Sequence, residues 1–233
     1  MKNNDDRFEL DNEENPFALS TGDLMAGLMF IFVLLLSYMM LNVQKKADRD
    51  SEITKEYNRI KTQLYIDLEK EFKDDLKVWN AVIDSAKLSI RFQEPKTLFA
   101  FNSANLNPKF KEILDDFFPR YLSVISSNAY KDNIEEIRIE GHTDSTGSYE
   151  ANMELSQDRT RTVLNHCLIL VGDDELKQWT TYRITANGLS FSHPILNEDG
   201  TENADLSRRV EFRIRTNAEK QLEKITKERE NNE

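Results

Sequence analysis

The sequence predicts an α+β protein with a single N-terminal transmembrane helix, a helical stalk and a small α/β sandwich domain. Three observations predict this architecture. An uncharged apolar run covers residues 24–43, a charged but periodic stretch follows over 44–87, and residues 88–216 alternate between strand-like and helix-like patterns. Strands interleaved with helices are typical of a domain in which helices cover a sheet. The 233 residues have room for such a domain and an extension.

Composition excludes several classes of function. The formal net charge is −11, with 42 acidic against 31 basic residues, whereas a nucleic-acid-binding surface needs clustered Lys and Arg. No direct nucleic-acid partner is therefore expected. Cys167 is the only cysteine, which excludes an internal disulfide and any multi-cysteine metal site. It lies on an apolar helix face and is predicted to be a buried, inert thiol.

The membrane segment is the first predicted element. Leu24 to Val43 are 20 residues without a charge, enough to cross a hydrocarbon core of roughly 30 Å. The apolar region of a signal peptide is shorter, and no small-residue cleavage site follows this run. We therefore expect a retained helix over residues 16–43, preceded by a short tail over 1–15. Counting Lys and Arg around the span would place its C-terminal side in the cytoplasm.

A carboxylate, Asp23, stands at the head of the apolar run, and two interpretations of it are open. If the helix starts near Ser20, the segment Ser20–Asp23 resembles a capping box in which Asp23 satisfies free backbone donors. If it starts at Pro16, Asp23 lies roughly 10 Å inside the helix. Ala26 and Gly27 then share its face, and small side chains allow a neighbouring helix to pack closely. An acid within a membrane span is a functional hypothesis by default.

The connecting segment over residues 44–87 is predicted to be a helical linker. Its apolar residues recur at spacings of three and four, with no Gly or Pro to break the helix. These residues are Ile53, Tyr57, Ile60, Leu64, Leu68, Phe72, Leu76, Trp79 and Ile83. Spacings of four outnumber those of three, which disfavours a long left-handed coiled coil. A solvated spacer and a paired helix both stay open, and either would hold the C-terminal domain away from the membrane.

The C-terminal domain is expected over residues 88–216. Helices are predicted over Pro108–Ile125 and 149–171, and the strand-like stretches are LSIRF, TLFAF, IEEIRIEGH, YRITANG and RRVEFRIRT. The remaining tail, residues 217–233, is charged and is predicted to be a frayed helix or disordered.

Three motifs in this domain carry a family resemblance. The stretch IEGHTDSTGSYEANMELSQDRTRTVL combines G-H-T-D, a glycine-containing loop and N-x-x-L-S-x-x-R at the start of a helix. FNSANLNP lies upstream of it, and SRRVEFRI closes the domain. Together these motifs resemble the OmpA-like peptidoglycan-binding domain. The resemblance implies a domain that binds the zwitterionic diaminopimelate end of the peptidoglycan stem peptide.

Residue roles follow from that resemblance. Asp144 would take the ammonium of the ligand, and Arg159 would take its carboxylate in bidentate fashion. Asn152, Leu155 and Arg159 share one helix face and could converge on the pocket; Thr143 would add a hydrogen bond. A purely structural interpretation is open for each: Asp144 and Arg159 bridge each other, Asn152 caps the helix and Leu155 belongs to the core.

Neither a cofactor nor enzymatic activity is expected. His142, in the G-H-T-D motif, is interpreted as a turn residue rather than a general base. No nucleophile, metal-binding set or second carboxylate is arranged around it in the sequence for hydrolysis.

Peptidoglycan lies outside the inner membrane, so the resemblance implies a periplasmic domain and a cytoplasmic N-terminal tail. This overrides the Lys and Arg count. The whole arrangement resembles the MotB class of stator subunits, in which an acid near the start of the span carries the transported ion. The resemblance aligns Asp23 with that acid, and it implies a homodimer inside a ring of a larger MotA-like membrane subunit.

Two departures separate the sequence from flagellar stator subunits. Its N-terminus is acidic where theirs is usually basic, and the familiar context of their aspartate is not reproduced. The sequence also resembles the MotB-like subunit of the Zorya anti-phage defence system. A flagellar-type stator subunit and a passive OmpA-type wall tether without ion transport are the alternatives.

Overall fold

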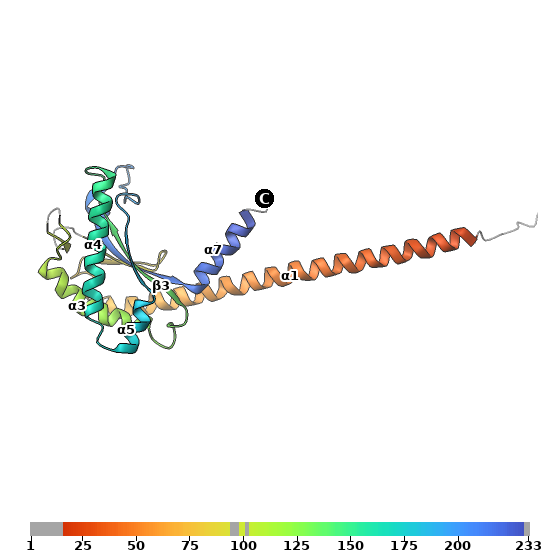
Figure 1. Ribbon diagram of the computed structural model, residues 1–233, viewed down its shortest axis with the longest axis horizontal. Helices are drawn as coiled ribbons and strands as arrows, with labels where there is room; N and C mark the ends of the chain where they lie inside the picture. The colour runs from red at the N-terminus through yellow and green to blue at the C-terminus, as the bar shows by residue number, and fades with distance from the viewer. Residues whose placement is uncertain (1–15, 94–97, 101–102, 231–233) are drawn as a thin grey trace, which may run out of the picture. The chain divides into compact units, whose positions relative to one another are not determined.

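The computed structural model describes residues 16–93, 98–100 and 103–230. The chain divides into two compact units, residues 1–51 and 52–233. Helix α1 (Pro16–Phe72) begins in the first and ends in the second (Figure 1). Proline suits a first helical position because its missing N–H would have no partner there.

The N-terminal unit contains the apolar part of α1. This helix is the one candidate among the described residues that is long and apolar enough to cross a membrane. Large apolar side chains are exposed on every side of it, from Leu24 to Val43. A helix that is apolar all round needs an apolar environment, which a bilayer provides. The observed helix is therefore a candidate for the predicted single span.

The C-terminal unit is built on a five-stranded sheet with the order β1-β2-β5-β3-β4. Its strands are β1 (Ala81–Asp84), β2 (Ser89–Phe92), β3 (Ile134–His142), β4 (Ile184–Gly188) and β5 (Arg209–Thr216). The pair β3–β4 is parallel and the other pairs are antiparallel.

Two long helices cover one face of this sheet. They are α3 (Pro108–Ile125) and α4 (Tyr149–Ile169), and Figure 1 shows both on the same side of the strands. Val210, Phe212 and Ile214 alternate along β5 and are buried. The Phe212 ring lies 5.0 Å from that of Phe117 on α3, measured between ring centroids. These contacts confirm the predicted α+β fold class.

Shorter helices complete the unit: α5 (Asp174–Thr181), α6 (Ala204–Ser207) and α7 (Asn217–Glu230). The charged tail is thus helical over Asn217–Glu230. The expected strand TLFAF lies partly outside the described residues. Within them, Phe99 forms a single antiparallel bridge with Leu106 rather than a strand.

The predicted helical linker differs from the structure in its second half. Helix α1 ends at Phe72, well before Lys87, and after a turn the chain enters β1. The apolar spacing continues through that turn because Trp79 packs on the same core, with its ring centroid 5.8 Å from that of Phe72. Ile60, Leu64, Leu68 and Phe72 are also buried in this core. From Ile60 onward the apolar stripe is therefore neither solvated nor free to pair with another chain.

Candidate functional site

The loop that follows β3 carries the first predicted site residues. Strand β3 ends at His142, so Thr143 and Asp144 come directly after it. The loop passes through Gly147, whose φ of +93° is the left-handed region that favours glycine. It then reaches Ser148, which caps α4 by accepting a hydrogen bond from Ala151 N at 3.2 Å.

Asp144 is buried, and both of its carboxylate oxygens have donors. Oδ1 accepts from the backbone N–H of Thr146 at 3.0 Å, and Oδ2 accepts from the Arg208 guanidinium. Burial alone would raise the pKa of Asp144, but the hydrogen bonds and charge of Arg208 and the N–H of Thr146 outweigh it and lower the pKa. Asp144 is thus a fixed anion at the edge of the sheet.

Arg159 lies on α4 and has no carboxylate partner among the described residues. Its Nε donates to the carbonyl of Ser103 at 2.9 Å, and its guanidinium lies 4.9 Å from the centroid of the Phe99 ring. Burial, followed by the positive charge of Arg208, lowers the pKa of Arg159, and the charge of Asp144 opposes this. The alternative interpretation, in which Asp144 and Arg159 bridge each other, is therefore wrong, because Asp144 bridges Arg208 instead.

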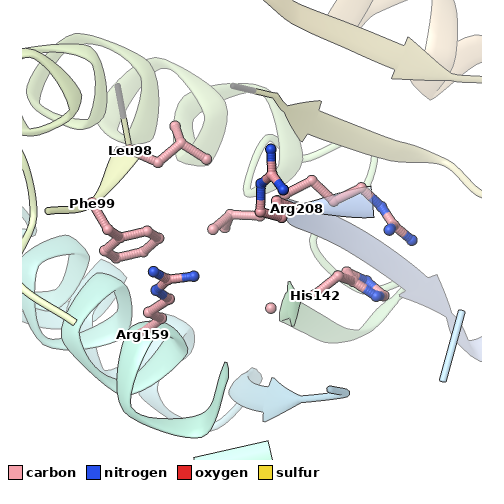
Figure 2. A pocket seen from close by; sticks show the side chains of 8 residues that line it. Leu98, Phe99, His142, Arg159 and Arg208 are labelled. Carbon is pink, nitrogen blue, oxygen red and sulfur yellow. The ribbon is translucent and has the colours of Figure 1, made fainter. Parts of the chain in front are cut away.

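Arg159 and Arg208 line one pocket. Its walls are Leu98, Phe99, Gly141, His142, Arg159, Arg208, Arg209 and Val210. Figure 2 shows the Arg159 guanidinium beside the Phe99 ring, with Arg208 across the pocket. Asp144 is joined to this wall through Arg208. Apolar surface beside fixed charges suits a small ligand with an apolar chain and a charged end.

The other predicted residues have different positions. Asn152 is buried, and its amide nitrogen donates to the carbonyls of Thr146 at 2.8 Å and Ser148 at 3.1 Å, so it braces the loop. Leu155 is half-buried on the same helix. Thr143 is 3% exposed, and its hydroxyl has no hydrogen-bond partner in the described chain.

Arg208 is the residue that the sequence reasoning missed. The sequence signal for it was the doublet Arg208-Arg209 at the start of the last strand. This doublet supported the family resemblance, but neither arginine was assigned to the site. Successive side chains of an extended segment point in opposite directions, so the two arginines have different partners. Arg208 bonds Asp144, while Arg209 bonds Glu211. One arginine of the doublet therefore serves the pocket wall and the other serves the sheet.

A buried charged cluster lies beside the site. Glu211 accepts from Arg209 Nε at 2.5 Å, Arg91 Nε at 3.1 Å and Ser89 Oγ at 3.1 Å. Burial alone would raise the pKa of Glu211, but the hydrogen bond and charge of Arg209 and the charge of Arg91 outweigh it and lower the pKa to about 2. His142 is 4% exposed, and burial lowers its pKa. The interpretation of His142 as a turn residue is wrong, because it is the last residue of strand β3 and pairs with Arg209 of β5.

Asp23 occupies a different setting. Because α1 begins at Pro16, Asp23 lies inside the helix and is not its N-cap, so the capping interpretation is wrong. Its side chain is exposed in the single chain. A Cβ atom added at Gly22 or Gly27 would meet nothing within 4 Å. This part of the helix therefore has room for a neighbour beside its carboxylate.

Comparison with known proteins identifies one matching family model and two similar curated proteins. Residues 98–207 match the model of the OmpA family. The chain is 42% identical over 225 residues to the Zorya protein ZorB of Escherichia coli strain Crooks, covering 93% of this chain and 95% of that protein. It is 28% identical over 212 residues to the Zorya protein ZorB of Escherichia coli O139:H28, covering 88% and 82%.

A solved structure is also similar. The crystal structure of a MotB-like protein from Desulfovibrio vulgaris aligns with a TM-score of 0.48 and 23% identity, covering 67% of this chain and 94% of the other.

Proposed function

Because the chain belongs to the family of the Zorya protein ZorB, we propose that it is the peptidoglycan-anchored subunit of an ion-driven inner-membrane motor that serves anti-phage defence. In this proposal α1 spans the membrane once, with the N-terminus in the cytoplasm and the OmpA-family domain in the periplasm. Two copies lie inside a ring of a larger MotA-like subunit. Asp23 carries the transported ion, a proton or sodium, between them.

The observation that carries the wall-binding part is the arrangement of charges at the pocket. Arg159 has no carboxylate partner in the described chain, and Asp144 is a buried anion bonded to a different arginine. A zwitterionic ligand end needs one fixed anion and one fixed cation that do not neutralise each other. Arginine adds bidentate geometry for a carboxylate. The diaminopimelate end of a stem peptide has this chemistry.

The position of Asp23 supports the ion-carrying part. It is an acid within the apolar helix, and Gly22, Ala26 and Gly27 lie around it. Small residues allow close approach of a second helix, and acids inside a span are kept where they act on ions or protons. A carboxylate that protein groups surround on assembly can bind a cation on one side of the membrane and release it on the other.

The wall-binding proposal is tested with isolated sacculi. Full chains carrying Asp144→Ala or Arg159→Ala are expected to lose most of their sacculus binding, since each loses a charge-assisted interaction worth about 1.5–3 kcal/mol. Arg161→Ala is the matched control, because Arg161 lies on the same helix and its side chain is 67% exposed. Circular dichroism checks that each variant is folded. Folded variants of Asp144 and Arg159 that pellet with sacculi as well as the control would contradict the proposal.

A further inference from the structure

We propose that Arg208 is a specificity-determining residue of this pocket, which makes binding depend on a carboxylate beside the ammonium of the ligand. The inference rests on the proposed wall-binding function. In the structure, the Arg208 guanidinium is bonded to the carboxylate of Asp144. An incoming ammonium competes with it, and only a ligand that also brings an anion gives the displaced guanidinium a new partner.

The first step is the occupancy of Asp144. Its two carboxylate oxygens already accept from Thr146 N and from Arg208. An ammonium that approaches Asp144 must share Oδ2 with Arg208 or displace it. The Asp144 side chain is only 11% exposed, so water compensates little for a lost partner. Competition between the ligand and Arg208 is therefore built into the site.

The second step is the freedom of Arg208 to move. Its guanidinium also bonds Asp205, whose side chain is 85% exposed, and Arg208 itself is 30% exposed. An exposed pair of this kind is weak and easily rearranged. Arg208 can thus leave Asp144 without itself becoming a buried unpaired charge, and its position on the pocket wall lets it turn towards a bound anion.

The third step is the charge of the pocket. Arg159 and Arg208 line the same walls, and the positive charge of Arg208 disfavours the charged form of Arg159. A ligand that brings only an ammonium adds a further positive charge beside these arginines. A ligand that brings a carboxylate as well gives both guanidiniums a common partner. Arg208 therefore weakens the binding of a ligand with an ammonium alone and strengthens the binding of a ligand that also has a carboxylate.

The two ligand classes differ in one group. A stem peptide with meso-diaminopimelate ends in an ammonium and a carboxylate, whereas one with lysine at the same position ends in the ammonium alone. The inference is that the chain prefers the first, and that this preference depends on Arg208 in addition to Arg159.

The experiment measures the dissociation constants of the full chain in detergent for these two soluble muropeptides. The unaltered chain is expected to prefer the diaminopimelate form by about tenfold or more, the worth of a charge-assisted bond. Arg208→Gln is expected to lower this ratio several-fold. Arg208→Lys keeps the positive competitor at Asp144 and should restore most of the ratio. Arg161→Gln, which alters an exposed arginine that does not line the pocket, should leave the ratio unchanged.

Several results would overturn the inference. The unaltered chain could bind both muropeptides equally. The ratio of the two dissociation constants could be the same in Arg208→Gln as in the unaltered chain, or it could be as low in Arg208→Lys as in Arg208→Gln. If Arg208→Gln fails to fold, Arg208→Met repeats the comparison with an unbranched, uncharged side chain and leaves Asp144 in place, and a wild-type ratio in Arg208→Met overturns the inference too. An unaltered chain that binds neither muropeptide would instead contradict the proposed wall-binding function.

Discussion

Two aspartates, Asp144 and Asp23, occupy opposite kinds of surroundings. Asp144 is 8% exposed, and its hydrogen-bond donors come from its own unit of the chain. Asp23 lies on an exposed apolar helix, where added atoms at the neighbouring glycines would touch nothing. The comparison teaches that the C-terminal unit supplies the partners of its buried aspartate from within one chain, whereas we expect the N-terminal unit to obtain them from other chains.

The largest expected effect is a difference in the free energy of unfolding between two Leu→Ala substitutions, one in each part of α1. Leu64 is 0% exposed in the core of the C-terminal unit, whereas Leu34 in the apolar segment is 53% exposed. Leu64→Ala should lower the free energy of unfolding by about 2–5 kcal/mol through lost burial and a cavity. Leu34→Ala should change it little. Urea denaturation of the full chain in detergent, followed by the fluorescence of Trp79 and Trp179, checks this, and equal effects would break the comparison.

The next effect concerns acid stability in the C-terminal unit. Glu211 has a folded-state pKa of about 2 against an ordinary value of 4.5. Its contribution to stability is complete above pH 4.5 and is lost as the pH falls towards 2, and it amounts to at most about 3 kcal/mol. Glu211→Gln should therefore lower stability at neutral pH and flatten its pH dependence between these values.

The control for Glu211 is Glu112→Gln, which alters an exposed carboxyl on α3. Denaturation curves recorded from pH 2 to pH 7 compare the two variants. Some pH dependence should persist in Glu211→Gln, because the pKa values of Glu136 and Glu140 are lowered as well. An unchanged pH dependence in Glu211→Gln would show that the buried cluster contributes nothing specific.

The smallest expected effect on the free energy of unfolding comes from replacing a glycine by alanine, once in each unit. At Gly188 an added Cβ would lie 2.3 Å from the backbone nitrogen of Gln157, so Gly188→Ala should cost about 1–3 kcal/mol through overpacking. Gly27→Ala has open space and should, if anything, favour the helix by up to about 1 kcal/mol. It should nevertheless weaken co-purification with the larger membrane subunit. Undiminished co-purification would contradict close helix packing beside Asp23.

Local patterns predicted much of the fold. The helix Pro108–Ile125 was predicted with its observed bounds, because a proline start and an apolar face at helical spacing determine it locally. The end of α1 was not, because the apolar spacing runs on through Trp79 into β1. That spacing reflects packing on the core, and it does not distinguish a helix from a turn that returns to the same core.

The candidate site was predictable only in part. Asp144 and Arg159 were found through a motif, and the structure associates both with one pocket through Arg208 and the pocket wall. The partner of Asp144 was not foreseen, because Arg208 lies 64 residues further along the chain and only strand pairing between β3 and β5 brings it near. Long-range pairing of this kind leaves no local pattern in one sequence.

The central claim is that Asp23 carries an ion, and Asp23→Asn tests it most directly. Asparagine keeps the size and hydrogen bonding of aspartate but does not titrate, and it suits a helix N-cap equally well. The measurement is phage plating efficiency together with the amount of assembled membrane complex. We expect normal assembly and complete loss of protection. Full protection by a normally assembled Asp23→Asn variant, as a passive wall tether would give, would contradict the claim.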